Sequence, residues 1–346
     1  MKTILWGICG IGMGHCNRQI SIIEHYKENY NIVILTYGTG LKFFKQKGFK
    51  VLEVANPYYV GDINGLNFEL TKKHPNNQID FEKINNKALS LINEDVVLVI
   101  SDYEMISAKY AYLKNIPLIT LDQQSKYLVG DFPLELNNCS YRDEIERLSM
   151  FFPKVNERIA ISFFKVPEVK SKFKVKILPP LIESLKKKKE GDFYLVYVTG
   201  QILSEINIEK WINILNNENL NYKIFISKKI KIKGKNIFYH GDNSFKDSLE
   251  QCKGLISTAG HSLLSEAMFL GKPVYAIPLN LYEQQLNAFK IVEGGFGISS
   301  KNLNKKNLKE FINNNEYYKK NISEDKTILL KKGKNIFKII DKYLIR

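Results

Sequence analysis

The chain has 346 residues, of which 44% are hydrophobic and 12% aromatic, enough to fill more than one core. It carries 51 Lys and Arg against 36 Asp and Glu, a net charge of +15, and no apolar run of 18 residues that could span a membrane. The four cysteines, at 9, 16, 139 and 252, have no paired spacing, which argues against a disulfide framework or a zinc site. The N-terminus shows no signal-peptide pattern, so we expect a cytoplasmic protein.

The positive charge is concentrated in the second half. Residues 1–170 contain 20 Lys and Arg against 19 Asp and Glu, whereas residues 171–346 contain 31 against 17. A basic half predicts an anionic partner such as a nucleotide, a membrane surface or nucleic acid. A biased composition with lysines on solvated faces explains the excess equally well.

The first half alternates apolar strands with amphipathic helices. This alternation predicts a parallel sheet covered on both faces. A polar, Asn- and Gly-rich stretch over 56–78 interrupts it and carries Tyr58 and Tyr59. The expected strands are 3–8, 31–37, 49–54, 96–101 and 117–121, and the expected helices are 14–27, 41–47, 81–93 and 104–114.

The alternation stops over 165–192, where three prolines and four consecutive lysines are typical of a connection between domains. It restarts at 193, and the segment 304–346 has helical spacing. We therefore expect two Rossmann-like, doubly wound α/β domains. The predicted boundaries are 1–165 for the first domain, 166–190 for the linker, 191–325 for the second domain and 326–346 for a final helix.

The stretch "GICGIGMGHCNRQ" (7–19) places several glycines between a strand and a helix. Its spacing differs from the dinucleotide fingerprint, so we expect the glycines to permit a tight turn and close approach by another molecule. His15 falls in the first turn of the helix, whose dipole disfavours the charged imidazole, as suits a general base. On spacing alone, a capping or packed histidine is favoured.

Asp102 follows the strand "VVLVIS" at the same edge of the predicted sheet. An aspartate there can orient the imidazole of His15 and stabilise its protonated form. It can equally cap the helix that begins near Glu104. The sequence leaves both roles open.

A second turn, "STAGHS" (257–262), leaves a buried strand and opens a helix. Gly260 allows close approach, and the free N–H groups of the first helical turn, at His261 and Ser262, predict an anion site suited to a diphosphate. Glu266, further along this helix, can accept both hydroxyls of a ribose. The start of a later helix offers a cluster suited to sugar hydroxyls: Glu283, Gln284, Gln285 and Asn287.

Four segments together resemble the GT-B glycosyltransferases, in the branch with the peptidoglycan N-acetylglucosaminyltransferase and the plant UDP-sugar transferases. Within it the chain looks most like poorly characterised bacterial and archaeal proteins that share a GxGxGHxxR start. The segments are "GIGMGHCNR", "ISDYEMISAKYAYLKNIPLITLDQQS", "VKILPPLI" and "STAGHSLLSEAMFLGKPVYAIPLNLYEQQLNA".

The resemblance implies two domains facing across a cleft, an acceptor domain and then a nucleotide-sugar domain, with the last helix crossing back to the first. His15 matches the base, Asp102 its partner and Glu266 the ribose ligand. Two features depart from the pattern: the loop after the first strand of the second domain is reduced to "VTGQ", and His261 replaces a bulky apolar or aromatic residue. The other expected donor-binding residues are Thr199, Gly200, Gly260, Ser262, Glu283, Gln284 and Gln285; Gly12, Gly14 and Arg18 are expected along the cleft near the phosphates, and Tyr58, Tyr59 and Gln123 on the acceptor side.

We therefore expect an inverting transferase that moves a sugar from a nucleoside diphosphate, for which we expect UDP, to an acceptor hydroxyl in cell-surface glycan synthesis. No Asp-x-Asp motif is present, so we expect no metal and no other cofactor. The expected partners are the nucleotide-sugar and a glycan or lipid-linked acceptor, with peripheral contact to an anionic membrane. A nucleotide-sugar hydrolase of the same fold is the main alternative; an epimerase of related fold and a non-catalytic or nucleic-acid-binding protein rank below it.

Overall fold

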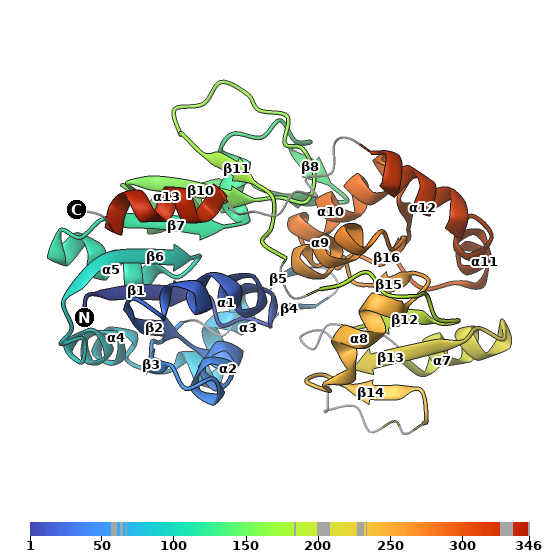
Figure 1. Cartoon of the computed structure of the whole chain (residues 1–346), viewed down its shortest axis with the longest axis horizontal. Coiled ribbons are helices and arrows are strands. Elements are labelled where there is room, and N and C mark those ends of the chain that lie inside the picture. Colours follow the sequence, from blue (N-terminus) through green and yellow to red (C-terminus); the bar gives the residue numbers. More distant parts are fainter. Residues whose placement is uncertain are drawn as a thin grey trace.

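The computed structural model describes residues 1–56, 61–62, 65–66, 68–182, 185–198, 208–226, 232, 234–325 and 335–344. Two parallel sheets lie side by side, each with helices packed on both faces (Figure 1). None of the helices described is both long and apolar enough to cross a membrane. The predicted fold class, two Rossmann-like halves, is confirmed.

The first sheet has seven strands in the order β11-β10-β7-β6-β1-β2-β3. Its centre, β1, pairs in parallel with β2 on one side and β6 on the other, so the strand order reverses there. Ligands of open α/β sheets bind outside the carboxyl ends of the strands at such a reversal. The strands are β1 (Thr3–Ile8), β2 (Asn31–Thr36), β3 (Lys50–Glu53), β6 (Val96–Asp102), β7 (Leu118–Asp122), β10 (Glu157–Ile161) and β11 (Lys176–Leu178).

Side chains that alternate along β1 feed the cores on the two faces of this sheet. Ile4 and Trp6 pack with α1 and α2, whereas Leu5 packs with α4, α5 and α6. The helices are α1 (Gly14–Tyr26), α2 (Gly38–Gln46), α3 (Phe68–Lys73), α4 (Phe81–Ser90), α5 (Met105–Lys114) and α6 (Arg142–Phe151). Short elements complete this half: β4 (Gly61–Asp62), β5 (Gly65–Leu66), η1 (Pro75–Asn77), η2 (Gln124–Leu128), β8 (Glu135–Leu136) and β9 (Cys139–Ser140).

The second sheet has six parallel strands in the order β14-β13-β12-β15-β16-β17. Its strands are β12 (Tyr194–Tyr197), β13 (Tyr222–Ile226), β14 (Ile237–Tyr239), β15 (Leu255–Ser257), β16 (Val274–Ala276) and β17 (Gly297–Ser299). Helices α7 and α11 cover one face, and α8, α9 and α10 the other. The helices are α7 (Ile208–Asn217), α8 (Ser244–Gln251), α9 (His261–Leu270), α10 (Tyr282–Glu293), α11 (Lys305–Asn313) and α12 (Asn315–Glu324).

The last helix, α13 (Asn335–Leu344), returns to the first sheet, as predicted (Figure 1). Ile336 and Ile340 are buried in the core that contains Trp6. The hydroxyl of Tyr26 on α1 donates to Asp341 Oδ1 over 2.8 Å. The end of the chain therefore stabilises its beginning.

The expected linker over 166–190 contributes residues to both domains. β11 lies within it and pairs with β10, so the first sheet extends beyond the expected boundary at residue 165. Leu181 is buried in the core of the first sheet and Leu185 in a core of the second. The prolines and lysines that indicated a connection belong to a segment that crosses the domain interface while buried at several points.

An aromatic cluster, formed by Tyr127, Tyr141 and Tyr282, joins the two halves. The ring of Tyr282 on α10 lies 5.6 Å from that of Tyr127 and 4.9 Å from that of Tyr141. The Tyr282 hydroxyl also donates to the Pro133 carbonyl. One hydrophobic core therefore continues from the first half into the second.

Candidate active site

Three glycines in the turn after β1 are needed for different structural reasons. A Cβ on Gly10 would lie 1.7 Å from the carbonyl oxygen of Tyr37, and Gly12 has φ +68°. A Cβ on Gly14 would lie 3.2 Å from Ser262 Oγ, which comes from α9 of the other half. The turn therefore lets the second half approach the start of α1, in line with the predicted role of these glycines.

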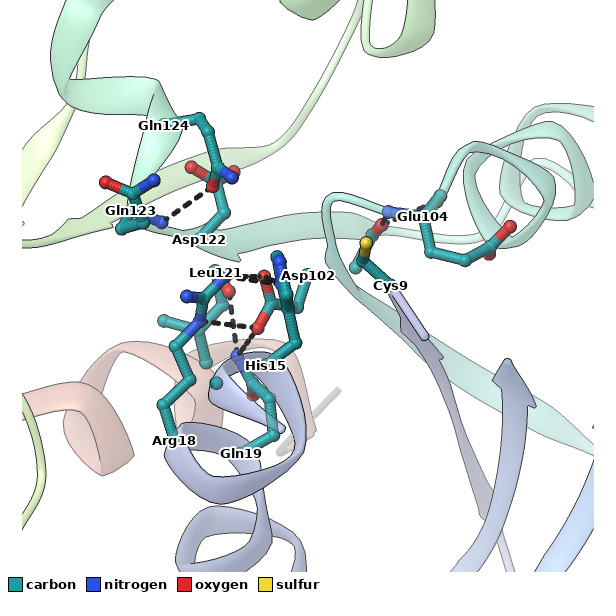
Figure 2. Close-up of polar contacts among 12 residues, drawn as sticks. Cys9, His15, Arg18, Gln19, Asp102, Glu104, Leu121, Asp122, Gln123 and Gln124 are labelled. Carbon is teal, nitrogen blue, oxygen red and sulfur yellow. Dashed lines mark hydrogen bonds and ion pairs between the residues drawn. The ribbon is translucent and has the colours of Figure 1, made fainter. Parts of the chain in front are cut away.

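His15 and Asp102 meet at the carboxyl edge of the first sheet (Figure 2). His15 lies in the first turn of α1, and Asp102 is the last residue of β6. The His15 Nδ1 atom is 2.9 Å from Asp102 Oδ1. Asp102 is fully buried, while 14% of the His15 side chain is exposed. The predicted proximity of these two side chains is confirmed.

Helix α5 is capped by a residue other than Asp102. Glu104 is its N-cap residue, and its carboxylate accepts from the amides of Ile106 and Ser107 over 2.7 Å each. The capping alternative for Asp102 is therefore wrong. Its carboxylate is left to the side chains of α1.

Two further side chains of α1 converge on Asp102 (Figure 2). Arg18 donates from Nε to Oδ2 over 2.7 Å and forms an ion pair with Oδ1 through Nη2. Gln19 donates from Nε2 to Oδ2 over 2.8 Å and to the Leu121 carbonyl over 2.8 Å. Gln19 is itself held by Trp6, whose Nε1 donates to Oε1. Gln19 was not predicted from the sequence, although its place one turn after His15 on a buried helix face was a usable signal.

These contacts set the protonation of the pair. Burial raises the pKa of Asp102, but Arg18 and His15 outweigh it and lower that pKa to about 2. Burial and Arg18 lower the pKa of His15, whereas Cys9 and Asp102 raise it, with a net rise to about 9. The helix dipole alone predicted a neutral imidazole; the adjacent carboxylate and thiol reverse that expectation.

The start of α9 faces the start of α1. Ser262 Oγ donates to the Gly14 carbonyl over 3.1 Å, and Gly260 is the N-cap residue of α9. The first amides of a helix have no partner within it and favour an anion. His261 is buried, and burial together with the charges of Lys126, Arg18 and His15 lowers its pKa well below the ordinary value.

A cavity of about 360 Å³ lies between α1, α2, α8, α9 and residues 180–182 and 185. Arg18 from one half and Ser262 and Glu266 from the other line it. Burial raises the pKa of Glu266 to about 7. Glu266, which is predicted to bind a ribose, therefore lines the same cavity as Arg18. Arg18 lies three residues after His15, the predicted base.

The predicted sugar-binding amides at the start of α10 already have protein partners. Gln284 Oε1 accepts from the Leu279 amide over 2.9 Å. Gln285 donates to the Leu279 carbonyl over 2.9 Å and accepts from Asn137 over 2.5 Å. The side-chain amide of Gln285 therefore joins α10 to the β8–β9 hairpin, and its contact with a donor sugar stays a prediction.

Lys126 is a charged residue at this edge that was not predicted as a site residue. It is fully buried in η2, and its Nζ donates to the Gln123 carbonyl over 2.8 Å and to the Gln123 side chain. Burial lowers its pKa to about 7, although Glu283 opposes the change. Lys126 stands between the polar stretch "DQQS" and the apolar "YLV", so no surrounding apolar run signalled its burial. Gln123, predicted on the acceptor side, is itself buried here.

Four predicted site residues lie outside the described residues: Tyr58, Tyr59, Thr199 and Gly200. Within the described part of the chain, no group of three or more His, Cys, Asp or Glu side chains is arranged to hold a metal ion.

The sequence matches Glycosyl transferase family 1 over residues 2–315. The chain belongs to this family. An uncharacterized glycosyltransferase of Methanosarcina mazei is 24% identical in an alignment 345 residues long. The alignment covers 86% of this chain and 85% of that protein. The predicted assignment to the glycosyltransferases is confirmed.

Solved structures of glycosyltransferases share the fold. The glycotransferase of kitacinnamycin has a TM-score of 0.66 at 12% identity, and the calicheamicin glycosyltransferase CalG4 has 0.64 at 14%. VinC, solved in complex with dTDP, has 0.62 at 10%. Each alignment covers 99% of this chain and 98% of the other. This glycosyltransferase therefore has the two-domain GT-B architecture.

Proposed function

We propose that this glycosyltransferase moves a sugar from a nucleoside diphosphate to an acceptor hydroxyl with inversion at the anomeric carbon. The observation that carries the proposal is the direct contact between the starts of α1 and α9, through Ser262 and Gly14. It sets a histidine–aspartate pair opposite a helix N-terminus suited to a diphosphate.

In the proposed step, His15 takes the proton of the acceptor hydroxyl as the acceptor oxygen bonds to the anomeric carbon. The bond from that carbon to the diphosphate oxygen breaks, and the electron pair leaves with the nucleoside diphosphate. Amides at the start of α9 stabilise the leaving group, the part that a metal ion plays in other transferases. Asp102 orients the imidazole and stabilises the imidazolium. A single displacement from the face opposite the diphosphate inverts the configuration.

Donor and acceptor follow from the same site. We infer a UDP-sugar donor or, because the similar VinC was solved with dTDP, a dTDP-sugar, with the ribose on Glu266, which lines the shared cavity. His15 and Asp102 both belong to the first half, so we infer that the acceptor binds on that side of the cleft. We propose a glycan or lipid-linked acceptor in cell-surface glycan synthesis, used in the cytoplasm or at the inner face of the membrane, where the basic second half would meet anionic lipid.

A thermal-shift screen with UDP, dTDP, GDP and CMP, followed by the matching nucleotide-sugars, tests the donor assignment. A ligand at 100 times its Kd stabilises the protein by about 2.7 kcal/mol, a clear rise in Tm. Glu266→Gln should abolish most of that rise. His15→Gln should keep it, yet reduce sugar transfer by about 10²- to 10⁴-fold.

The same assay separates the competing readings. Absence of any shift with all nucleotides would overturn the donor assignment. Free sugar as the only product, with every acceptor tried, would instead indicate a hydrolase. Full transfer activity in His15→Gln would remove His15 from the mechanism.

A further inference from the structure

The carboxylate of Asp102 is shared between two groups of α1. His15 Nδ1 lies 2.9 Å from Oδ1, and Arg18 forms an ion pair with the same oxygen while Nε binds Oδ2. Arg18 Nη2 also lies 2.6 Å from His15 Nδ1. The guanidinium therefore touches both members of the proposed catalytic pair.

Sharing changes what Asp102 does to the imidazole. A buried carboxylate that has only an imidazole for a partner favours the protonated ring, because otherwise its charge stays uncompensated. A guanidinium remains charged at all accessible pH values, so it compensates the carboxylate whether or not the imidazole is protonated. Only 8% of the Arg18 side chain is exposed, and the Asp102 side chain is fully buried. Solvent therefore does little to weaken this ion pair.

We propose that Arg18 is a positioning residue that neutralises Asp102 and thereby allows His15 to release its proton and serve as the base. The inference rests on the proposed function, in which a neutral His15 must meet the acceptor hydroxyl. Gln19, bound to Oδ2, keeps the carboxylate in place without adding charge. The HxxRQ spacing thus places base, charge partner and anchor on one helix face.

Other charged and titratable groups lie around His15, Arg18 and Asp102. Cys9, after β1, raises the pKa of His15, and the charge of His15 lowers the pKa of His261 at the start of α9. Glu283 on α10 and Asp122 on β7 interact with the charge of Arg18, and Cys16 on α1 interacts with that of Asp102. Among the described residues, none of these side chains forms a hydrogen bond with the Asp102 carboxylate, so Arg18 is the cation whose removal tests the sharing.

The test is an NMR titration of His15 in the ligand-free protein, with histidine labelled at Cε1 and the His15 signal identified by its loss in His15→Gln. Arg18→Met and Arg18→Gln should each raise the pKa of His15 by about one unit or more. Arg18→Lys, which retains the charge, should stay near wild type. Lys114→Met is the matched control, because Lys114 is exposed at the far end of α5.

An unchanged or lower His15 pKa in the uncharged variants, with native melting curves, would overturn the proposal. Failure of both uncharged variants to fold, beside a folded Arg18→Lys, would assign Arg18 a structural role and overturn it as well. The titration needs no substrate, so its outcome is separate from that of the transfer assay. If Arg18→Met raises the pKa while His15→Gln remains fully active, the base assignment fails and the charge sharing stands.

Discussion

At the residue scale, the contacts of His15 make a prediction about the pH dependence of transfer. Asp102 and Cys9 raise the pKa of His15 to about 9 against the effects of burial and Arg18. A base accepts a proton only when neutral, so the rate should rise with pH until His15 has lost its proton.

We therefore expect kcat/KM for the donor found in the screen to increase about tenfold per pH unit from pH 7 towards about 9, then level off. The measurement is a pH–rate profile with a stability check at each pH. A profile that is flat across this range in wild type would contradict the role of His15. The residual activity of His15→Gln should lack the rise.

Lys126 predicts a pH dependence of stability. Burial lowers its pKa from 10.5 to about 7, so between these values the unfolded chain binds more protons than the folded one. The free energy of unfolding should therefore rise with pH across this interval, by up to about 4 kcal/mol from this group.

Lys126→Met should remove that rise, and urea unfolding at pH 7, 8.5 and 10 measures the difference from wild type. The exposed Lys114→Met should track wild type at all three values. If Lys126→Met and wild type gain stability in parallel, Lys126 is charged in the folded protein.

At the scale of elements, the predicted strand ends were enough to place the catalytic pair but not to predict the partners of every site residue. Uninterrupted apolar runs and the residues after them placed His15 and Asp102 together, since the carboxyl ends of parallel strands share an edge. The hydrogen bond from Asn137 to Gln285 joins α10 to a hairpin 148 positions earlier in the sequence. No local sequence pattern predicts such a contact. β10 lies inside the predicted first domain but was not predicted as a strand, although "RIAIS" is as apolar as the strands that were.

Helix α13 gives the element-scale prediction. Ile340 is fully buried in the core beside Trp6, although it lies at the far end of the chain. Ile340→Ala leaves a cavity there and should lower the free energy of unfolding by about 2–5 kcal/mol.

Lys342→Ala, on the exposed side of the same helix, should change stability by less than about 0.5 kcal/mol. Urea unfolding followed by circular dichroism measures both variants. Equal stability of Ile340→Ala and wild type would show that α13 is not held on the first domain in solution.

At the scale of the whole molecule, polar and hydrophobic contacts both join the two halves. Beside the cavity, Ser262 donates to the Gly14 carbonyl, and the ring of His261 lies 5.3 Å from that of Phe163. At the start of α10, Tyr282 packs into the aromatic cluster with Tyr127 and Tyr141. These contacts on both sides of the interface suit a cleft that admits substrates while its halves stay joined.

The aromatic cluster also predicts how the molecule unfolds. Because one hydrophobic core runs through both halves, calorimetry of the wild type should give a single cooperative transition. Tyr282→Ala removes a buried ring and the hydroxyl that binds the Pro133 carbonyl, which should cost about 3 kcal/mol. The loss falls on the interface, so the two halves should then melt in separate steps. Tyr317→Ala, an exposed ring on α12, is the control and should keep one transition. A single unshifted transition in Tyr282→Ala would mean that the halves are coupled elsewhere, through α13 or the segment that carries β11.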